Sequence, residues 1–206
     1  MFTALFLFAV AFSGRATTIV VLLNTPNGDM GTSHVFTQDG VTITAYSYAI
    51  SGNSQPDLYG KNGGADGTGL GLTNDPDHEI NTTDFVQLDF ANPIALKVTQ
   101  AQFQMDSVQC GEGWALYGSN TQGTLGTELM TSNSQDAESV LALPHFGEYD
   151  DYSWTATSGN VLLGEILLTP GAAATDAGAP DPQSMAATGA ALIGLSLMVR
   201  RLRQPR

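Results

Sequence analysis

The chain has 206 residues, of which 42% are hydrophobic and 13% charged, a length that fits one domain with short targeting segments. Between positions 17 and 180 it carries 19 acidic residues and two basic ones, Lys61 and Lys97, so this central part has a net charge of −17. Nucleic-acid binding needs clustered Lys and Arg, so the composition excludes nucleic acid as an expected partner.

Cysteine and histidine content excludes two further classes of protein. Cys110 is the single cysteine, so the fold is not a disulfide scaffold, and we expect a half-buried structural thiol there. His34, His78 and His145 are scattered through the chain without the spacing of a zinc site.

The first predicted element is a signal peptide over residues 1–16. Residues 2–12 are almost wholly apolar and are followed by small residues, with Gly14 at −3 and Ala16 at −1 of the expected cleavage site. No Lys or Arg precedes the apolar run, which leaves the true start codon open. A buried first strand is the alternative, although eleven residues this apolar fit an export helix better.

Residues 17–168 predict an all-β domain, because short β-branched and apolar runs alternate with turn residues and no amphipathic helix stands out. Residues 41–48 alternate with period two, and Asp39-Gly40 before them predicts a tight hairpin turn. Strands at this spacing favour a two-sheet antiparallel sandwich of jelly-roll type. The predicted strands are 18–23, 35–37, 41–48, 85–90, 94–105, 114–117, 125–130, 139–143, 152–156 and 161–168.

Residues 51–83 are predicted to form one long irregular loop, since they hold seven glycines and many acids. A loop of this length in a compact domain is usually functional or mobile. Calcium prefers carboxylate and carbonyl oxygens on a sharply turning chain, so we hypothesise a calcium site on four acids of this loop. The alternative is that these acids are solvated or cap the turn around Asn74 and Pro76. The four proposed ligands are Asp66, Asp75, Asp77 and Glu79.

The C-terminal residues form a three-part pattern. Residues 169–181 are a Pro-, Gly- and Ala-rich flexible spacer, and residues 182–206 a tail whose uncharged run, 185–199, predicts a short transmembrane helix of about 22 Å. Arginines after this run would stay on the cytoplasmic side. The motif residues are the triplet Pro180, Asp181 and Pro182 and the basic cluster Arg200, Arg201 and Arg203.

This tail resembles the PEP-CTERM sorting signal of bacterial surface proteins, with Pro-Asp-Pro in place of Pro-Glu-Pro. The resemblance implies export through the Sec machinery, an inner-membrane-anchored precursor, processing by an exosortase, and a Gram-negative host that produces exopolysaccharide. The body resembles a recurring ectodomain of PEP-CTERM proteins to which no reaction is assigned. The segments that carry this second resemblance are 57–64, 69–72, 77–80, 85–89, 114–119, 143–147 and 155–163.

Three functions remain open from the sequence. The first, which we favour, is a non-catalytic structural or interaction protein of the cell surface or biofilm matrix. The second is a carbohydrate-binding module for extracellular polysaccharide, with or without calcium, in which Tyr46, Tyr59 and Trp114 offer aromatic faces, unless these are packing residues. The third, ranked last, is a glycan hydrolase that uses two carboxylates such as Glu79 and Glu112. No Gly-x-Ser-x-Gly motif is present, and we expect no enzyme.

Overall fold

The computed structural model of the chain describes residues 17–51, 54–64, 67–132 and 139–171. The predicted signal peptide, nearly all of the spacer, the sorting tail and Asp66 lie outside these residues, so the expectations about them stay predictions. No helix within the described ranges is long and apolar enough to cross a membrane.

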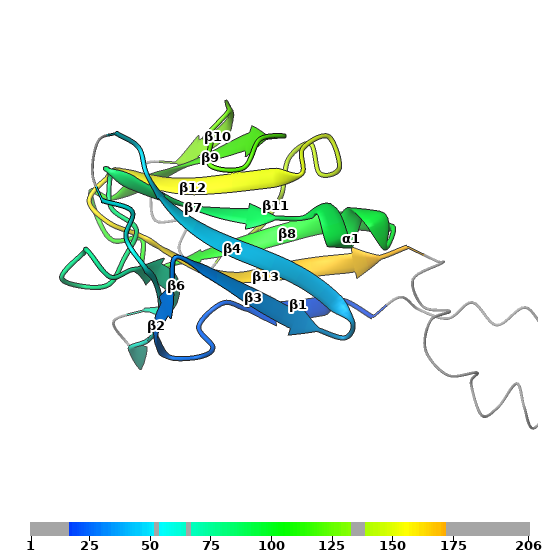
Figure 1. Cartoon of the computed structure of the whole chain (residues 1–206), viewed down its shortest axis with the longest axis horizontal. Helices are drawn as coiled ribbons and strands as arrows, with labels where there is room; N and C mark the ends of the chain where they lie inside the picture. Colours follow the sequence, from blue (N-terminus) through cyan, green and yellow to red (C-terminus); the bar gives the residue numbers. More distant parts are fainter. Residues whose placement is uncertain (1–16, 52–53, 65–66, 133–138, 172–206) are drawn as a thin grey trace, which may run out of the picture. The chain divides into compact units, whose positions relative to one another are not determined.

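The described chain folds into two antiparallel sheets, as predicted, and Figure 1 shows how they are arranged. The first sheet has the order β11-β8-β13-β6-β5-β2, with β1 added on β13, and the second has the order β10-β9-β12-β7-β4-β3. The first contains β1 (Ile19–Leu22), β2 (Gly28–Gly31), β5 (Leu58–Asn62), β6 (Thr68–Leu72), β8 (Val98–Asp106), β11 (Val140–Ala142) and β13 (Leu162–Pro170). The second contains β3 (Ser33–Gln38), β4 (Val41–Ala49), β7 (Asp84–Asp89), β9 (Gly113–Ser119), β10 (Thr127–Ser132) and β12 (Asp151–Ser158).

The inner faces of the two sheets share one hydrophobic core, so the architecture is a β-sandwich. Phe103 of β8 packs edge-on against Trp114 of β9 and Trp154 of β12, with 5.5 Å between ring centroids in both pairs. All three side chains are fully buried. Edge-to-face aromatic contacts of this kind add about 0.5–1.5 kcal/mol each to the stabilisation from buried area. They tie the two layers together at the centre of the sandwich.

The predicted hairpin and alternation are confirmed. Gln38 pairs with Val41 across a two-residue turn in which Asp39 and Gly40 both have positive φ, 50° and 80°. Such backbone angles match the twist of the flanking strands, and Asp-Gly tolerates them at low cost. Along β4 the buried and half-buried side chains alternate, so one face of this strand contributes to the core.

The prediction of a structureless loop over residues 51–83 is wrong, because β5 and β6 form a paired hairpin within it. The glycines mark close packing there. A Cβ atom at Gly71 would meet the backbone of His78, and one at Gly60 would meet the carbonyl oxygen of Pro26. Glycine in a strand often indicates that a second backbone comes this close. Strand β2, which the sequence analysis did not predict, is such a neighbour, because it pairs with β5.

Two further expectations are corrected. The segment predicted as one strand over 94–105 begins with the short helix α1 (Ala91–Ala95), and β8 starts at Val98 after Lys97, whose φ is 62°. Cys110 is exposed rather than half-buried, because it stands in an exposed turn before β9 and not in a strand.

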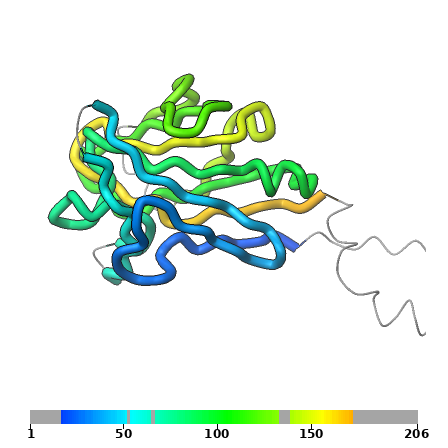
Figure 2. The backbone as a smooth tube through the Cα atoms, in the orientation of Figure 1, coloured from blue at the N-terminus to red at the C-terminus, as the bar shows by residue number. Residues whose placement is uncertain are grey.

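Both described ends of the chain lie at one end of the sandwich. Ile19 pairs with Leu168, so the beginning of β1 lies beside the end of β13, as the trace in Figure 2 shows. The nine residues of β13 cover about 27–30 Å at roughly 3.3 Å per residue. The loop before β13 therefore lies at the opposite end, which we call the distal end.

Candidate functional site

A polar pocket of about 360 Å³ lies at the distal end. Strand β5, the turn before Ile80 and the loops that precede β9 and β13 contribute its walls. Because Asp106 of β8 pairs with Leu162 of β13, the two loops that adjoin these residues meet at this end. The residues that line the pocket are Lys61, Pro76, Asp77, Glu79, Gln109 and Asn160.

A buried ion pair forms the floor of the pocket. The Lys61 Nζ atom lies 2.7 Å from the Glu79 Oε1 atom, and the side chains are only 14% and 4% exposed. The Ser107 hydroxyl donates a hydrogen bond of 2.9 Å to the same oxygen. Burial raises the pKa of Glu79 and outweighs the lowering by Lys61 and Ser107, while the charge of Glu112 adds a smaller rise. The pair therefore holds opposite charges where water has limited access.

The turn above this pair is held by Asp75. Its Oδ1 atom accepts hydrogen bonds from the backbone N–H groups of Asp77 (2.9 Å) and Glu79 (3.4 Å) and from the Asn160 side chain (3.2 Å). Asp77 itself is exposed at the rim. The predicted residues Asp75, Asp77 and Glu79 are thus brought together, but each has a different environment.

The structure does not gather these acids into a metal centre. Within residues 17–51, 54–64, 67–132 and 139–171, no group of three or more His, Cys, Asp or Glu side chains is arranged to hold a metal ion. Glu79 is engaged by Lys61 and Ser107, and Asp75 caps the turn, which was the alternative interpretation of these acids. Asp66 lies outside the described residues, so the calcium site in this loop stays a prediction.

The three predicted aromatic residues occupy separate places. Tyr59 of β5 stacks on His78 beside the pocket, with 3.9 Å between ring centroids and an interplanar angle of 16°. Tyr46 of β4 stacks on Tyr48 at 6.3 Å, on the outer face of the second sheet. Trp114 is fully buried in the core, so it offers no face to a sugar and serves as a packing residue. A single aromatic platform is therefore not formed.

A second group of polar residues lies on the outer face of the second sheet, at the end where the described chain begins and ends. Pairing of β4, β7, β12 and β9 places Thr44, Asp89, Asp151 and Ser119 in one row. Asp151 is only 6% exposed. Burial, followed by the charges of Asp89 and Asp150, raises the pKa of Asp151 to about 6. Sequence reasoning missed this row, since only strand pairing joins residues 62 positions apart.

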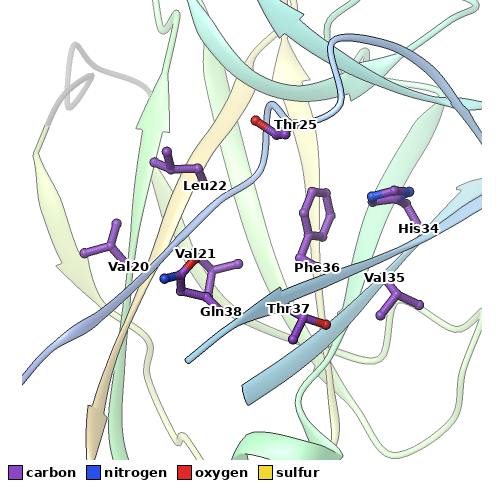
Figure 3. Close-up of a pocket in the computed structure, with 9 residues that line it drawn as sticks. All are labelled: Val20, Val21, Leu22, Thr25, His34, Val35, Phe36, Thr37 and Gln38. Carbon is purple, nitrogen blue, oxygen red and sulfur yellow. The ribbon is translucent and has the colours of Figure 1, made fainter. Parts of the chain in front are cut away.

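A groove of about 450 Å³ runs between strands β1 and β3, and Figure 3 shows the apolar and polar side chains that line it. Val20, Leu22 and Val35 are 40%, 55% and 54% exposed there. Strand β1 is added on β13 of the first sheet and β3 is the edge strand of the second, so the groove lies between the two sheets. Its lining also includes the polar side chains of Thr25, His34, Thr37 and Gln38.

Comparison with known proteins adds no assignment: no protein-family model matches the chain, and no curated protein matches it.

Proposed function

We propose that the chain is an exported cell-surface protein with a non-catalytic interaction role, and that its distal pocket binds extracellular polysaccharide. The observation that carries this proposal is the lining of the pocket. Gln109 offers an amide and Asp77 a carboxylate at exposed positions, and Lys61 has N–H groups besides the one bonded to Glu79. A sugar hydroxyl both donates and accepts, so a mixed lining suits a glycan better than an apolar ligand.

The position of the pocket supports the same proposal. The described chain ends at Gly171, beside the start of β1 and about 27–30 Å from the distal end. A sorting tail of the kind proposed from residues 182–206 would follow from that end and leave the pocket at the far side of the domain. The exosortase, the Sec machinery and the membrane are the partners this proposal implies, and the negative body disfavours nucleic acid.

One observation favours a second candidate, a glycan hydrolase. Glu79 has a raised pKa and interacts with Glu112, which is the relation expected of a general acid and a neighbouring carboxylate. Against it, the Oε1 atom of Glu79 is already bonded to Lys61 and Ser107. Release of reducing ends from a bound polysaccharide would identify this second activity.

The jelly-roll connectivity of the sandwich stays a prediction. Successive strands from β6 to β9 alternate between the two sheets, which is the kind of crossing a jelly roll contains. The hairpins do not cross between the sheets: β3–β4 lies within the second sheet and β5–β6 within the first.

A glycan array probed with the full chain tests the proposed function. The double variant Asp77→Ala with Gln109→Ala removes two exposed pocket side chains. We expect its affinity for the glycan to fall at least about tenfold, because it loses one charged and one neutral hydrogen-bonding group. Asp39→Asn with Gln100→Ala is the matched control, because it removes one charge and one amide from exposed positions outside the pocket. Equal binding by the pocket variant, or no binding by the unaltered chain, would contradict the proposal.

A further inference from the structure

The edge strands of the two sheets differ in how well they are protected against pairing with another chain. An edge strand leaves a row of N–H and C=O groups free, and natural proteins block such edges with short strands, charged side chains or β-bulges. Of the edge strands in the described residues, β11 has only three residues, and β2 and β10 each carry an acid and a register shift. Strands β1 and β3 contain no Asp, Glu, Lys or Arg and no register shift.

The free backbone groups of β1 belong to Val20 and Leu22. The N–H of Leu23 donates a hydrogen bond of 3.4 Å to the carbonyl of Gly164 in β13. In an antiparallel pair, residues that bond the neighbouring strand alternate with residues whose N–H and C=O groups point the other way. Val20 and Leu22 therefore direct these groups away from β13, and among the described strands β1 pairs with β13 alone.

Strand β3 has an open edge at the same groove. The Ser47 N–H donates to the carbonyl of Thr32, just before β3 (3.2 Å), so by the same alternation Val35 directs its N–H and C=O groups away from β4. Val20, Leu22 and Val35, all labelled in Figure 3, are three of the six large hydrophobic side chains that are exposed in the described ranges. Apolar side chains gathered along open strand edges indicate a surface that pairs with another strand.

The charge of the groove indicates what kind of partner fits it. The nine residues that line it include no Asp, Glu, Lys or Arg, whereas positions 17–180 carry a net charge of −17. Like charges repel, so two copies of this chain approach each other at least cost where neither copy presents an acid. A charged partner, in contrast, would find no opposite charge in the groove.

We propose that the groove between β1 and β3 is a docking surface for a second copy of the chain, with β1 of each copy paired antiparallel to β1 of the other. Because both copies use the same surface, a two-fold axis relates them. The pairing joins the first sheets of the two copies into one continuous sheet. It also satisfies the free edge of β1 and covers the exposed side chains of Val20 and Leu22.

The sequence of β1 fits this two-fold pairing in one register. An axis at Val21 places Val20 opposite the partner's Leu22, and Leu22 opposite the partner's Val20. These are the residues whose N–H and C=O groups point to the open edge, so both pairs exchange backbone hydrogen bonds. The partner strand then lies in the groove, where Val35 of β3 lines the opposite wall.

Sedimentation velocity of the full chain, held in a mild detergent because of its uncharged run 185–199, measures the association. One short strand per copy makes a small interface, so we expect a dissociation constant of about 1–50 μM. Val20→Glu with Leu22→Glu places like charges opposite each other in the paired strands and should raise this constant at least about tenfold. Leu96→Glu with Val140→Glu is the matched control, because it makes the same change at side chains 38% and 43% exposed outside the groove.

Chemical cross-linking tests the pairing of β1 with β1 directly. In a Cys110→Ser background, which removes the exposed native thiol, Leu22→Cys supplies one reactive group per copy. Strand spacing and rise place this position about 8 Å from its counterpart in the partner, within reach of a short bismaleimide. We expect a covalent dimer from Leu22→Cys and none from Val140→Cys in the same background.

The two measurements together keep the proposal open to refutation. A full chain that stays monomeric up to about 100 μM would overturn it. A dimer that survives Val20→Glu with Leu22→Glu, or that the control variant weakens equally, would place the contact elsewhere and overturn it as well. Failure of Leu22→Cys to cross-link would refute the register even if a dimer forms. Glycan binding at the distal pocket enters neither measurement, so the proposed function stands or falls separately.

Discussion

Asp151→Asn should stabilise the protein at neutral pH, and the gain should depend on pH in a defined direction. The pKa of Asp151 is about 6 in the folded state against an ordinary value of 3.8, because of its burial and the charges of Asp89 and Asp150. Between these two values the folded state binds a proton that the unfolded state has lost. Stability from this group is therefore complete below about pH 4 and is lost as the pH rises through 6.

The size of the effect follows from the same shift. A difference of about two pKa units corresponds to about 3 kcal/mol if the whole shift appears in the free energy of unfolding. The structure leaves Asp151 slight access to solvent, and side chains around it can adjust, so we expect about 1–3 kcal/mol above pH 7. Asparagine carries no charge at any pH, so the variant avoids this loss.

Urea unfolding at pH 4.5, 5.5, 6.5 and 7.5 measures the effect. The difference in the free energy of unfolding between Asp151→Asn and the unaltered chain should grow from pH 4.5 to 6.5 and then level off. Asp39→Asn serves as the control, because it removes the same charge from an exposed residue. It should change the free energy of unfolding by less than about 0.5 kcal/mol at every pH. A pH-independent difference, or a variant that is less stable at pH 7.5, would refute the assignment of a buried, uncompensated carboxylate.

Two other predictions follow from the fold, and a third from the proposed export. Lys61→Met leaves Glu79 buried without its cation, so it should lower the free energy of unfolding by about 3–5 kcal/mol in chemical denaturation. A loss under about 1 kcal/mol would show that the ion pair is accessible to solvent. Gly71→Ala places a Cβ atom against the backbone of His78, so it should lower the Tm by about 4–10 °C in a melting curve. An unchanged Tm would mean that the turn containing His78 can move away. For the proposed export and sorting, intact-mass measurement from the native host should find a protein without the signal peptide and the basic tail; a mass that retains either segment contradicts the corresponding prediction.

Features that depend on neighbouring residues could be predicted from the sequence. The alternation of side chains along 41–48 repeats every two residues, so it identifies a half-buried strand without reference to the rest of the chain. Asp39-Gly40 predicts its turn because these two residues tolerate positive φ wherever they occur. The all-β class and the two antiparallel sheets followed from repeated local signals of this kind.

The same local signals were misleading where a distant segment decides the structure. Glycine has a poor strand propensity, so 51–83 resembled a loop, but in β5 and β6 glycine is needed because another backbone comes within contact distance. The length of the strand before Met105 was also misjudged, since α1 interrupts the chain and packs beside β4 and β8.

The two groups of functional interest depend on strand pairing and loop placement. Glu79 meets Lys61 and Ser107, 18 and 28 residues away, whereas the sequence alone suggested Glu79 as a calcium ligand or as the partner of Glu112. Asp89 and Asp151 lie 62 residues apart and become direct neighbours when β7 pairs with β12. A shift of one residue in that pairing would turn Asp151 to the core, because side chains alternate between the faces of a strand. Local sequence patterns thus determined the class of fold, and composition determined the sign of its charge. The register between distant strands decided which of the acids stand together and which of them lie buried.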